Sequence, residues 1–320
     1  MDFEEFLKEW NDDSPTVLVH TSGSTGVPKP LWVEKCRMEA SARITCDFLG
    51  LHEGDKALLC LPLDYIAGKM MVVRSLVRGL KLQVVSPSGT PHWTTSIDFA
   101  AMVPMQVWNL LQTDEGRQRL MQIRHLIIGG GAIDESLAKE LKSFPNAVWS
   151  TYGMTETLSH IALRRLSGPE ASAYYTPFPS VEVSLNDDGC LVINAPAVHD
   201  GVLVTNDIAE IRQDSSFRVI GRKDNVICSG GIKIQIEEVE RLLRPHLSVP
   251  FMITCAPDPR LGQQVVLLLE EGDVSYAETV CRKVLPKYWQ PRRILTIDRL
   301  PLTETGKPAR QIAKKILEIS

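Results

Sequence analysis

The segment from residue 20 to residue 29 contains residue types that could hold phosphate. It reads H-T-S-G-S-T-G-V-P-K and directly follows the apolar, β-branched stretch T-V-L-V at 16–19. Glycines permit backbone angles that turn successive amide groups towards one anion, hydroxyls add donors, and lysine adds a point charge. The spacing differs from the G-x-x-x-x-G-K-[ST] loop, and a polar hairpin turn is the alternative interpretation. We predict a phosphate-binding loop formed by Thr21, Ser22, Gly23, Ser24, Thr25, Gly26 and Lys29.

Four segments further along the chain could do related chemistry. They read S-T-Y-G-M-T-E-T at 150–157, T-N-D at 205–207, G-R-K-D-N with S-G-G-I-K-I at 221–234, and P-L-T-E-T-G-K-P-A-R at 301–310. A flat ring suits a planar base, a hydroxyl suits an oxyanion, and a carboxylate suits a hard cation or two sugar hydroxyls. Taken singly, each segment has a structural alternative, such as a buried tyrosine, a solvated glutamate or an aspartate at a strand-end turn.

The five segments together, in this order, resemble those of adenylate-forming enzymes. This superfamily comprises the acyl-CoA synthetases, the adenylation domains of peptide synthetases, and the luciferases. The resemblance covers about residues 16–315. It implies that a carboxylate attacks the α-phosphate of MgATP, giving acyl-AMP and pyrophosphate, and that a thiol, usually coenzyme A, then attacks the acyl-AMP. ATP, Mg²⁺ and coenzyme A are therefore the expected cofactors.

The resemblance also implies roles for single residues. Tyr152 would stack on adenine with Gly153 beside it, Thr155 would contact the α-phosphate, and Glu156 would ligate Mg²⁺. Asp207 would accept hydrogen bonds from both ribose hydroxyls, in a T-N-D sequence where the family usually has T-G-D. Asparagine tolerates left-handed backbone angles better than most residues, so we expect the turn to persist.

The second half of the chain supplies the remaining expected site residues. By resemblance, Arg222 would hold the ribose, Asp224 would be the interdomain hinge, and Lys307 would be the catalytic lysine of adenylation. Gly231 would lie in the turn that opens the thiol tunnel. Lys233, a candidate phosphate contact, occupies a position where relatives often carry arginine.

Two stretches resemble the o-succinylbenzoate–CoA ligases of menaquinone synthesis more closely. One is L-P-L-D-Y-I-A-G-K-M at 61–70, in which Tyr65 replaces the common histidine, and the other is L-S-H-I-A at 158–162. The acid-binding candidates they imply are Arg74, Lys69, Ser159 and His160. For Arg74 an ordinary solvated helix face is the alternative, because basic residues recur at 74, 78 and 81.

The alternation of predicted strands and helices must position these groups. Strands are expected at 16–19, 56–62, 82–85, 124–128 and 147–149, and helices at 3–10, 34–49 and 67–80. This pattern predicts an α/β large domain with a parallel sheet, in which Gly130, Gly131 and Ala132 would line the adenine and acyl pocket. Short strands over 181–220 resemble a small β-barrel-like subdomain. An α+β lid domain is expected to follow, giving domains 1–221 and 224–320, with an N-terminal subdomain shortened relative to the family.

Composition narrows the function classes. The chain has 320 residues, a formal net charge of −4 and interspersed charges, which argues against nucleic-acid partners and membrane insertion. Its seven scattered cysteines and the lack of a signal-peptide pattern lead us to expect a reducing, cytoplasmic location. The expected partners are a small carboxylic acid, ATP and coenzyme A, and a homodimer is one alternative for the oligomeric state.

Three alternatives to an o-succinylbenzoate–CoA ligase stay open. The chain could be another aryl- or acyl-CoA ligase, or a stand-alone adenylation enzyme that loads a carrier-protein thiol. The ATP motifs do not distinguish either of these two enzymes from an o-succinylbenzoate–CoA ligase. A non-catalytic homologue is the third, and the presence of Glu156, Asp207 and Lys307 argues against it.

Overall fold

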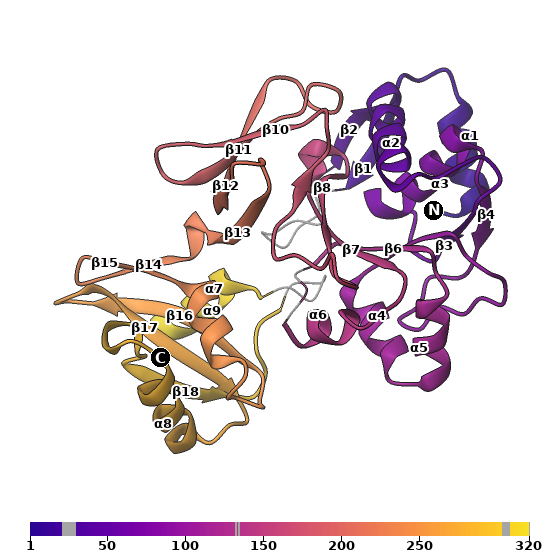
Figure 1. Cartoon of the computed structure of the whole chain (residues 1–320). Helices are drawn as coiled ribbons and strands as arrows, with labels where there is room; N and C mark the ends of the chain where they lie inside the picture. Colours follow the sequence, from indigo (N-terminus) through magenta and orange to yellow (C-terminus); the bar gives the residue numbers. More distant parts are fainter. Residues whose placement is uncertain (21–29, 132, 134, 303–307, 320) are drawn as a thin grey trace.

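The computed structural model describes residues 1–20, 30–131, 133, 135–302 and 308–319. The predicted phosphate loop at 21–29, Ala132 and Lys307 lie outside the described residues. Figure 1 shows a larger N-terminal lobe and a smaller C-terminal lobe, joined through β13 and the segment that follows it.

A seven-stranded sheet forms the centre of the N-terminal lobe. Its order is β4 (Lys81–Val84), β3 (Lys56–Leu59), β5 (Phe99–Met102), β6 (His125–Ile128), β7 (Ala147–Gly153), β8 (His160–Arg165) and β9 (Thr176–Pro177). The strands from β4 to β7 are parallel, and β8 and β9 are antiparallel to their neighbours. The predicted parallel sheet is therefore confirmed. Its carboxyl edge is where α/β proteins usually place their ligands.

Helices cover both faces of this sheet. On one face lie α1 (Phe3–Asn11), α2 (Lys35–Leu49) and α3 (Ile66–Arg78), and on the other lie α4 (Pro104–Leu111), α5 (Asp114–Met121) and α6 (Glu135–Leu141). Alternation along the strands explains this division, because successive side chains point to opposite faces. In β3, for example, Leu59 packs with the first group, whereas Leu58 packs with the second.

A two-stranded hairpin flanks the predicted phosphate loop. β1 (Thr16–His20) pairs antiparallel with β2 (Pro30–Glu34), and His20 lies opposite Pro30. The segment 21–29 therefore connects two paired strands. A hairpin connection and a phosphate loop are compatible interpretations of the same segment.

Residues 181–220 form a sheet that is separate from the central one. Strands β10 (Glu182–Leu185), β11 (Cys190–Asn194), β12 (Val202–Ile211) and β13 (Phe217–Arg222) lie in this order and pair antiparallel. In the part of the chain that the structure describes, these four strands form an open sheet where a barrel-like unit was expected, and β13 is joined to Tyr175 by an isolated antiparallel bridge at Phe217. Phe217 belongs to the same apolar core as helices α1 to α3.

The C-terminal lobe is α+β, as predicted. It contains η2 (Lys223–Asn225), β14 (Val226–Ser229), β15 (Ile232–Gln235), α7 (Ile236–Leu243), β16 (Phe251–Asp258), β17 (Gly262–Glu270), α8 (Val274–Val284), η3 (Lys287–Trp289), β18 (Arg293–Ile297) and α9 (Arg310–Ile319). Helices α7 and α8 pack on one face of its sheet and α9 packs on the other. Over the described ranges, no helix combines the length and apolar character needed to cross a bilayer.

Candidate active site

Three residues predicted to bind a nucleoside come together from β7, β12 and β13. The Tyr152 hydroxyl donates a hydrogen bond to Asp207 Oδ2 at 2.6 Å, and Arg222 Nη1 donates to Asp207 Oδ1 at 3.4 Å. Burial raises the pKa of the Tyr152 phenol, and the adjacent Asp207 carboxylate raises it further. The phenol therefore keeps the proton that it donates, and the Asp207 carboxylate is fixed in orientation.

An aromatic cluster holds the Tyr152 ring in place. The ring of Tyr152 meets that of Phe217 edge-on at 5.1 Å between centroids, and Tyr175 stacks on Phe217 at 5.6 Å. The Tyr175 hydroxyl in turn lies 2.9 Å from Ser150 Oγ. Such a cluster restricts the ring, and a restricted aromatic ring suits a platform for a planar base.

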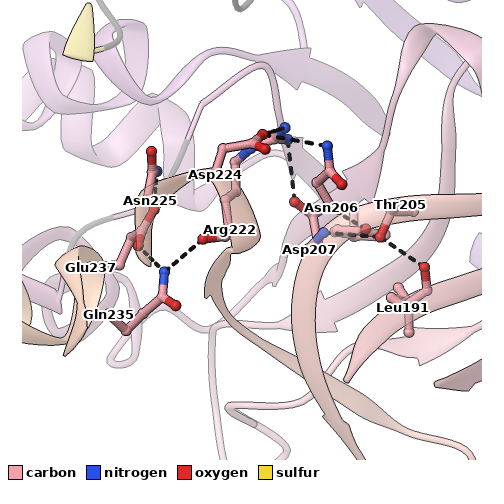
Figure 2. A network of polar contacts seen from close by, with 10 residues as sticks. Leu191, Thr205, Asn206, Asp207, Arg222, Asp224, Asn225, Gln235 and Glu237 are labelled. Carbon is pink, nitrogen blue, oxygen red and sulfur yellow. Dashed lines mark hydrogen bonds and ion pairs between the residues drawn. The ribbon is translucent and has the colours of Figure 1, made fainter. Parts of the chain in front are cut away.

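The Arg222 guanidinium links this group to the predicted hinge. Figure 2 shows Arg222 between two carboxylates, with Nη2 donating to Asp224 Oδ2 at 2.7 Å. Asn206 Nδ2 also donates to Asp224 Oδ2, at 3.4 Å, and Gln235 Nε2 donates to the Arg222 carbonyl at 3.0 Å. The carboxylate expected to bind ribose and the expected hinge carboxylate thus share one cation.

The predicted glycine turn lies at the same edge of the sheet as Tyr152. Strands β6 and β7 are parallel, and Ile128 is in register with Ser150. Two residues further on, Gly130 follows the carboxyl end of β6 and Tyr152 lies near the carboxyl end of β7. Gly130 has a φ of +78°, a left-handed conformation that favours glycine. Because β6 and β7 are neighbours, we expect this turn to border the base site.

A tight turn after β7 presents the predicted α-phosphate and magnesium ligands. Thr155 and Glu156 lie in η1 (Thr155–Thr157), where Thr155 is half-buried and Glu156 is exposed. The hydroxyl of the buried Thr157 accepts from the Met154 amide at 3.1 Å and lies 2.8 Å from the Ser159 carbonyl. Sequence reasoning assigned no role to Thr157, which fixes the shape of this turn.

The backbone beyond η1 is held in an unusual conformation. Leu158 has a φ of +62°, which is costly for a residue other than glycine and persists only where the surroundings enforce it. Gly153 approaches the same segment so closely that a Cβ there would lie 2.3 Å from the Ser159 carbonyl oxygen. The strained turn and this close approach bring Ser159 and His160 next to the Tyr152 strand.

Arg74, Ser159 and His160, the predicted acid ligands, form one buried group. Arg74 Nη2 donates to Ser159 Oγ at 2.6 Å, and Ser159 Oγ lies 3.2 Å from His160 Nδ1. Arg74 is only 2% exposed, so the alternative interpretation as a solvated helix face is wrong for this residue. Burial lowers the pKa of its guanidinium to about 10. Among the described residues, Arg74 has no carboxylate within ion-pair distance.

His160 is a neutral, buried ring in this group. Its Nε2 lies 3.1 Å from the hydroxyl of Thr45, a fully buried residue of α2. Burial, with a smaller contribution from the Arg74 charge, lowers the pKa of His160 well below 6.5. Sequence reasoning missed Thr45, because nothing in the local pattern of α2 relates it to a residue 115 positions away.

Lys69 makes contacts of a different kind from the other acid-binding candidates. Its ammonium group lies 3.1 Å from Glu9 Oε2 and donates to the Leu18 carbonyl at 2.8 Å, above the Phe6 ring. Lys69 is 2% exposed, so this cation is satisfied by the protein. It joins α1 to Leu18 of β1, three residues before the predicted phosphate loop, and its described contacts give it a structural role.

The candidates of the C-terminal lobe lie on two other elements. Gly231 and Lys233 are exposed on the β14–β15 hairpin, where Gly231 has a φ of +83°. Arg310, which ends the last motif, donates to both carboxylate oxygens of Glu240 at 2.8 Å and to the Ile253 carbonyl at 2.9 Å. This bidentate pair anchors the start of α9 to α7 and β16.

Glu156 is the predicted magnesium ligand in this arrangement. The described ranges contain no cluster of three or more His, Cys, Asp or Glu side chains placed to hold a metal. A magnesium ion that accompanies nucleotide phosphates usually takes only one or two protein carboxylates and completes its shell with phosphate and water. The exposed carboxylate of Glu156 on η1 fits that requirement.

Comparisons with known proteins identify similar sequences and similar folds. A family model described as AMP-binding enzyme matches residues 4–206. The 2-succinylbenzoate–CoA ligase of Salmonella typhimurium is 29% identical over 311 residues, which cover 90% of this chain and 66% of that protein. The chain thus spans about two thirds of the length of this relative.

Two solved structures are also similar. One is an acyl-CoA synthetase (AMP-forming)/AMP-acid ligase II-like protein from Dyadobacter fermentans, 33% identical, with a TM-score of 0.67, covering 98% of this chain and 93% of that one. The other is o-succinylbenzoate CoA synthetase from Bacillus subtilis in complex with its acyl-adenylate intermediate, 25% identical, with a TM-score of 0.79, covering 93% of this chain and 68% of that one. Because the family model matches more than half of the chain, this protein belongs to the AMP-binding enzyme family.

Proposed function

We propose that this protein is an acid–thiol ligase that uses ATP to activate a carboxylic acid as acyl-AMP and transfers the acyl group to coenzyme A. The contacts among Tyr152, Asp207 and Arg222 support the first step. They provide an aromatic platform beside a carboxylate whose orientation is fixed, at the carboxyl edge of a parallel sheet. A nucleoside has a flat base and two adjacent hydroxyls, which match these groups.

We further propose that the acid is an aromatic dicarboxylate, with 2-succinylbenzoate as the specific candidate. One observation carries this proposal, namely that Arg74 is buried and has no carboxylate partner among the described residues. An isolated buried charge is costly, so a site that keeps one is suited to a ligand of opposite charge. One carboxylate would be activated and the other would pair with Arg74. The names of the Salmonella and Bacillus relatives support the same acid.

Residues outside the described part of the chain would stabilise the negative charge that develops on the phosphate in the first step. Lys307 and the loop at 21–29 would donate to the phosphate oxygens as negative charge develops there. Magnesium, held by Glu156, would supply charge neutralisation of the phosphates. The lid, residues 224–320, would rotate about Asp224 against the large domain, residues 1–221, between the two steps.

Two coupled assays test this proposal. Pyrophosphate release should require ATP and 2-succinylbenzoate, and a thioester should appear only when coenzyme A is added. Asp207→Asn should raise the KM for ATP, whereas Asp214→Asn, in an exposed turn, should leave it unchanged. Pyrophosphate release without a coenzyme A thioester would point to a carrier-protein acceptor instead. The absence of release with any member of an aromatic and aliphatic acid panel would refute ligase activity.

A further inference from the structure

We propose that Thr45 is a positioning residue that sets the acid specificity of this site by fixing the tautomer of His160. The inference rests on the proposed function, because it concerns how Arg74 is held for a second carboxylate. Thr45 belongs to α2, whereas Arg74 belongs to α3 and His160 begins β8. It thus comes from a third element of the fold.

Four side chains and one carbonyl group form a continuous line of hydrogen bonds. Arg74 Nη2 lies 2.6 Å from Ser159 Oγ, and Ser159 Oγ lies 3.2 Å from His160 Nδ1. His160 Nε2 lies 3.1 Å from Thr45 Oγ1, which lies 3.1 Å from the Ser41 carbonyl oxygen. Arg74, His160 and Thr45 are buried and Ser159 is half-buried, so water competes little for the contacts at the Thr45 end of the line.

The two ends of this line determine its direction. A guanidinium can only donate hydrogen bonds and a carbonyl oxygen can only accept them. If every proton is used, Ser159 accepts from Arg74 and donates to His160 Nδ1. His160 must then donate from Nε2 to Thr45, whose own proton goes to the Ser41 carbonyl. The geometry therefore assigns the Nε2–H tautomer to His160.

The opposite tautomer would leave one proton unused. A proton on Nδ1 would donate to Ser159 Oγ, which already accepts from Arg74. The Ser159 proton would then have no acceptor along this line. Ser159 Oγ would accept from both Arg74 and His160, which its two lone pairs allow, but it would no longer donate along the line. The mutual polarisation that strengthens its contact with Arg74 would then be lost. The hydroxyl of Thr45 disfavours this state, because it gives the Nε2 proton a buried acceptor.

Removing that hydroxyl should change the tautomer without changing the shape of the site. Valine has nearly the same shape as threonine but cannot accept the Nε2 proton, so Thr45→Val leaves a buried donor unpaired. Buried donors without partners are rarer than unpaired acceptors, so we expect the proton to move to Nδ1. Thr45→Ser keeps the hydroxyl and is the matched control.

The first measurement needs no substrate. In protein carrying ¹⁵N-labelled histidine, the ring nitrogen shifts of His160, assigned by their loss in His160→Gln, distinguish the two tautomers. We expect Nε2–H in the wild type and in Thr45→Ser, and Nδ1–H in Thr45→Val. An Nδ1–H ring in the wild type, or the same tautomer in all three proteins, would overturn the inference.

The second measurement tests the consequence for specificity. The ratio of kcat/KM for 2-succinylbenzoate to kcat/KM for a matched aromatic acid lacking the second carboxylate should fall about three- to tenfold in Thr45→Val. It should be unchanged in Thr45→Ser, and the mono-acid value should change little in both. An unchanged ratio in Thr45→Val would overturn the specificity role. A wild type that does not prefer the dicarboxylate would instead refute the proposed substrate class, and the tautomer measurement would still decide the hydrogen-bond direction.

Discussion

Replacing Arg74 with methionine tests whether Arg74 serves ligand binding or the stability of the fold. Methionine fills a similar length of apolar space but has no charge. Burial lowers the pKa of Arg74 from 12.5 to about 10, and a difference of this size corresponds to a cost on the order of 3 kcal/mol for keeping the charge. We therefore expect Arg74→Met to leave the free energy of unfolding unchanged or to raise it, by up to about 3 kcal/mol.

The same substitution should impair the proposed reaction selectively. A hydrogen-bonded contact between the guanidinium and a carboxylate contributes about 1.5–3 kcal/mol, so kcat/KM for 2-succinylbenzoate should fall roughly 10- to 150-fold. The KM for ATP and the kcat/KM for an acid with a single carboxylate should change little, because neither would contact Arg74.

Arg78→Met is the matched control for this experiment. Arg78 lies one turn further along α3, is 28% exposed and pairs with Asp47. Its loss should affect both acids equally and by little, because exposed ion pairs contribute about 0–1 kcal/mol. Pyrophosphate release gives the rates, and denaturant unfolding gives the stabilities. Destabilisation of Arg74→Met by several kcal/mol, or an equal loss of activity on both acids, would refute the reasoning.

Four further outcomes follow from the site. Lys307→Ala should abolish acyl-AMP formation yet largely spare thiolysis of supplied acyl-AMP, and an equal loss of both half-reactions would contradict its assignment. Asp224→Pro should form acyl-AMP but fail at thioester formation, because proline fixes φ and removes a backbone donor. Asp224→Ala, which keeps the backbone free, is its control, and an unimpaired Pro variant would place the hinge elsewhere. Tyr152→Phe should raise the KM for ATP about tenfold or more, because Asp207 loses a short hydrogen bond from the phenol; an unchanged KM would exclude this role. Because the pKa of His160 in the folded protein lies well below 6.5, the unfolded chain binds more protons as the pH falls below about 6.5. The free energy of unfolding should then decrease by up to about 1.4 kcal/mol per pH unit from this group. In His160→Gln the free energy of unfolding should decrease less steeply as the pH falls. Identical pH dependences of this free energy in the two proteins would count against a neutral ring.

The amino-acid sequence by itself determined the local structure well wherever the apolar pattern was regular. The helix expected at 3–10 is α1 within one residue, and the helix expected at 34–49 is α2 within one residue. The alternation of strands and helices also predicted the parallel sheet. These features depend on neighbouring residues, because the period of the apolar pattern follows from the geometry of the local backbone.

Strand pairing and sheet closure were less accessible to the sequence. Neither β2 nor β18 was predicted, and the strands at 181–220 form an open sheet rather than a barrel-like unit in the described part of the chain. The partners of a strand lie elsewhere in the chain, so a short apolar segment does not reveal whether it is an edge or how far its sheet continues.

Burial and contacts between distant segments were decided only by the tertiary structure. The basic residues at 74, 78 and 81 have the spacing of a solvated helix face, yet Arg74 is buried, because the face of α3 that carries it packs inside the lobe. Tyr152 meets Asp207 across 55 positions, and Thr45 meets His160 across 115. Residue types and their order predicted which groups could serve the chemistry. Packing of α2, α3 and β8 decided which of them meet, because such contacts depend on the whole fold and not on local spacing.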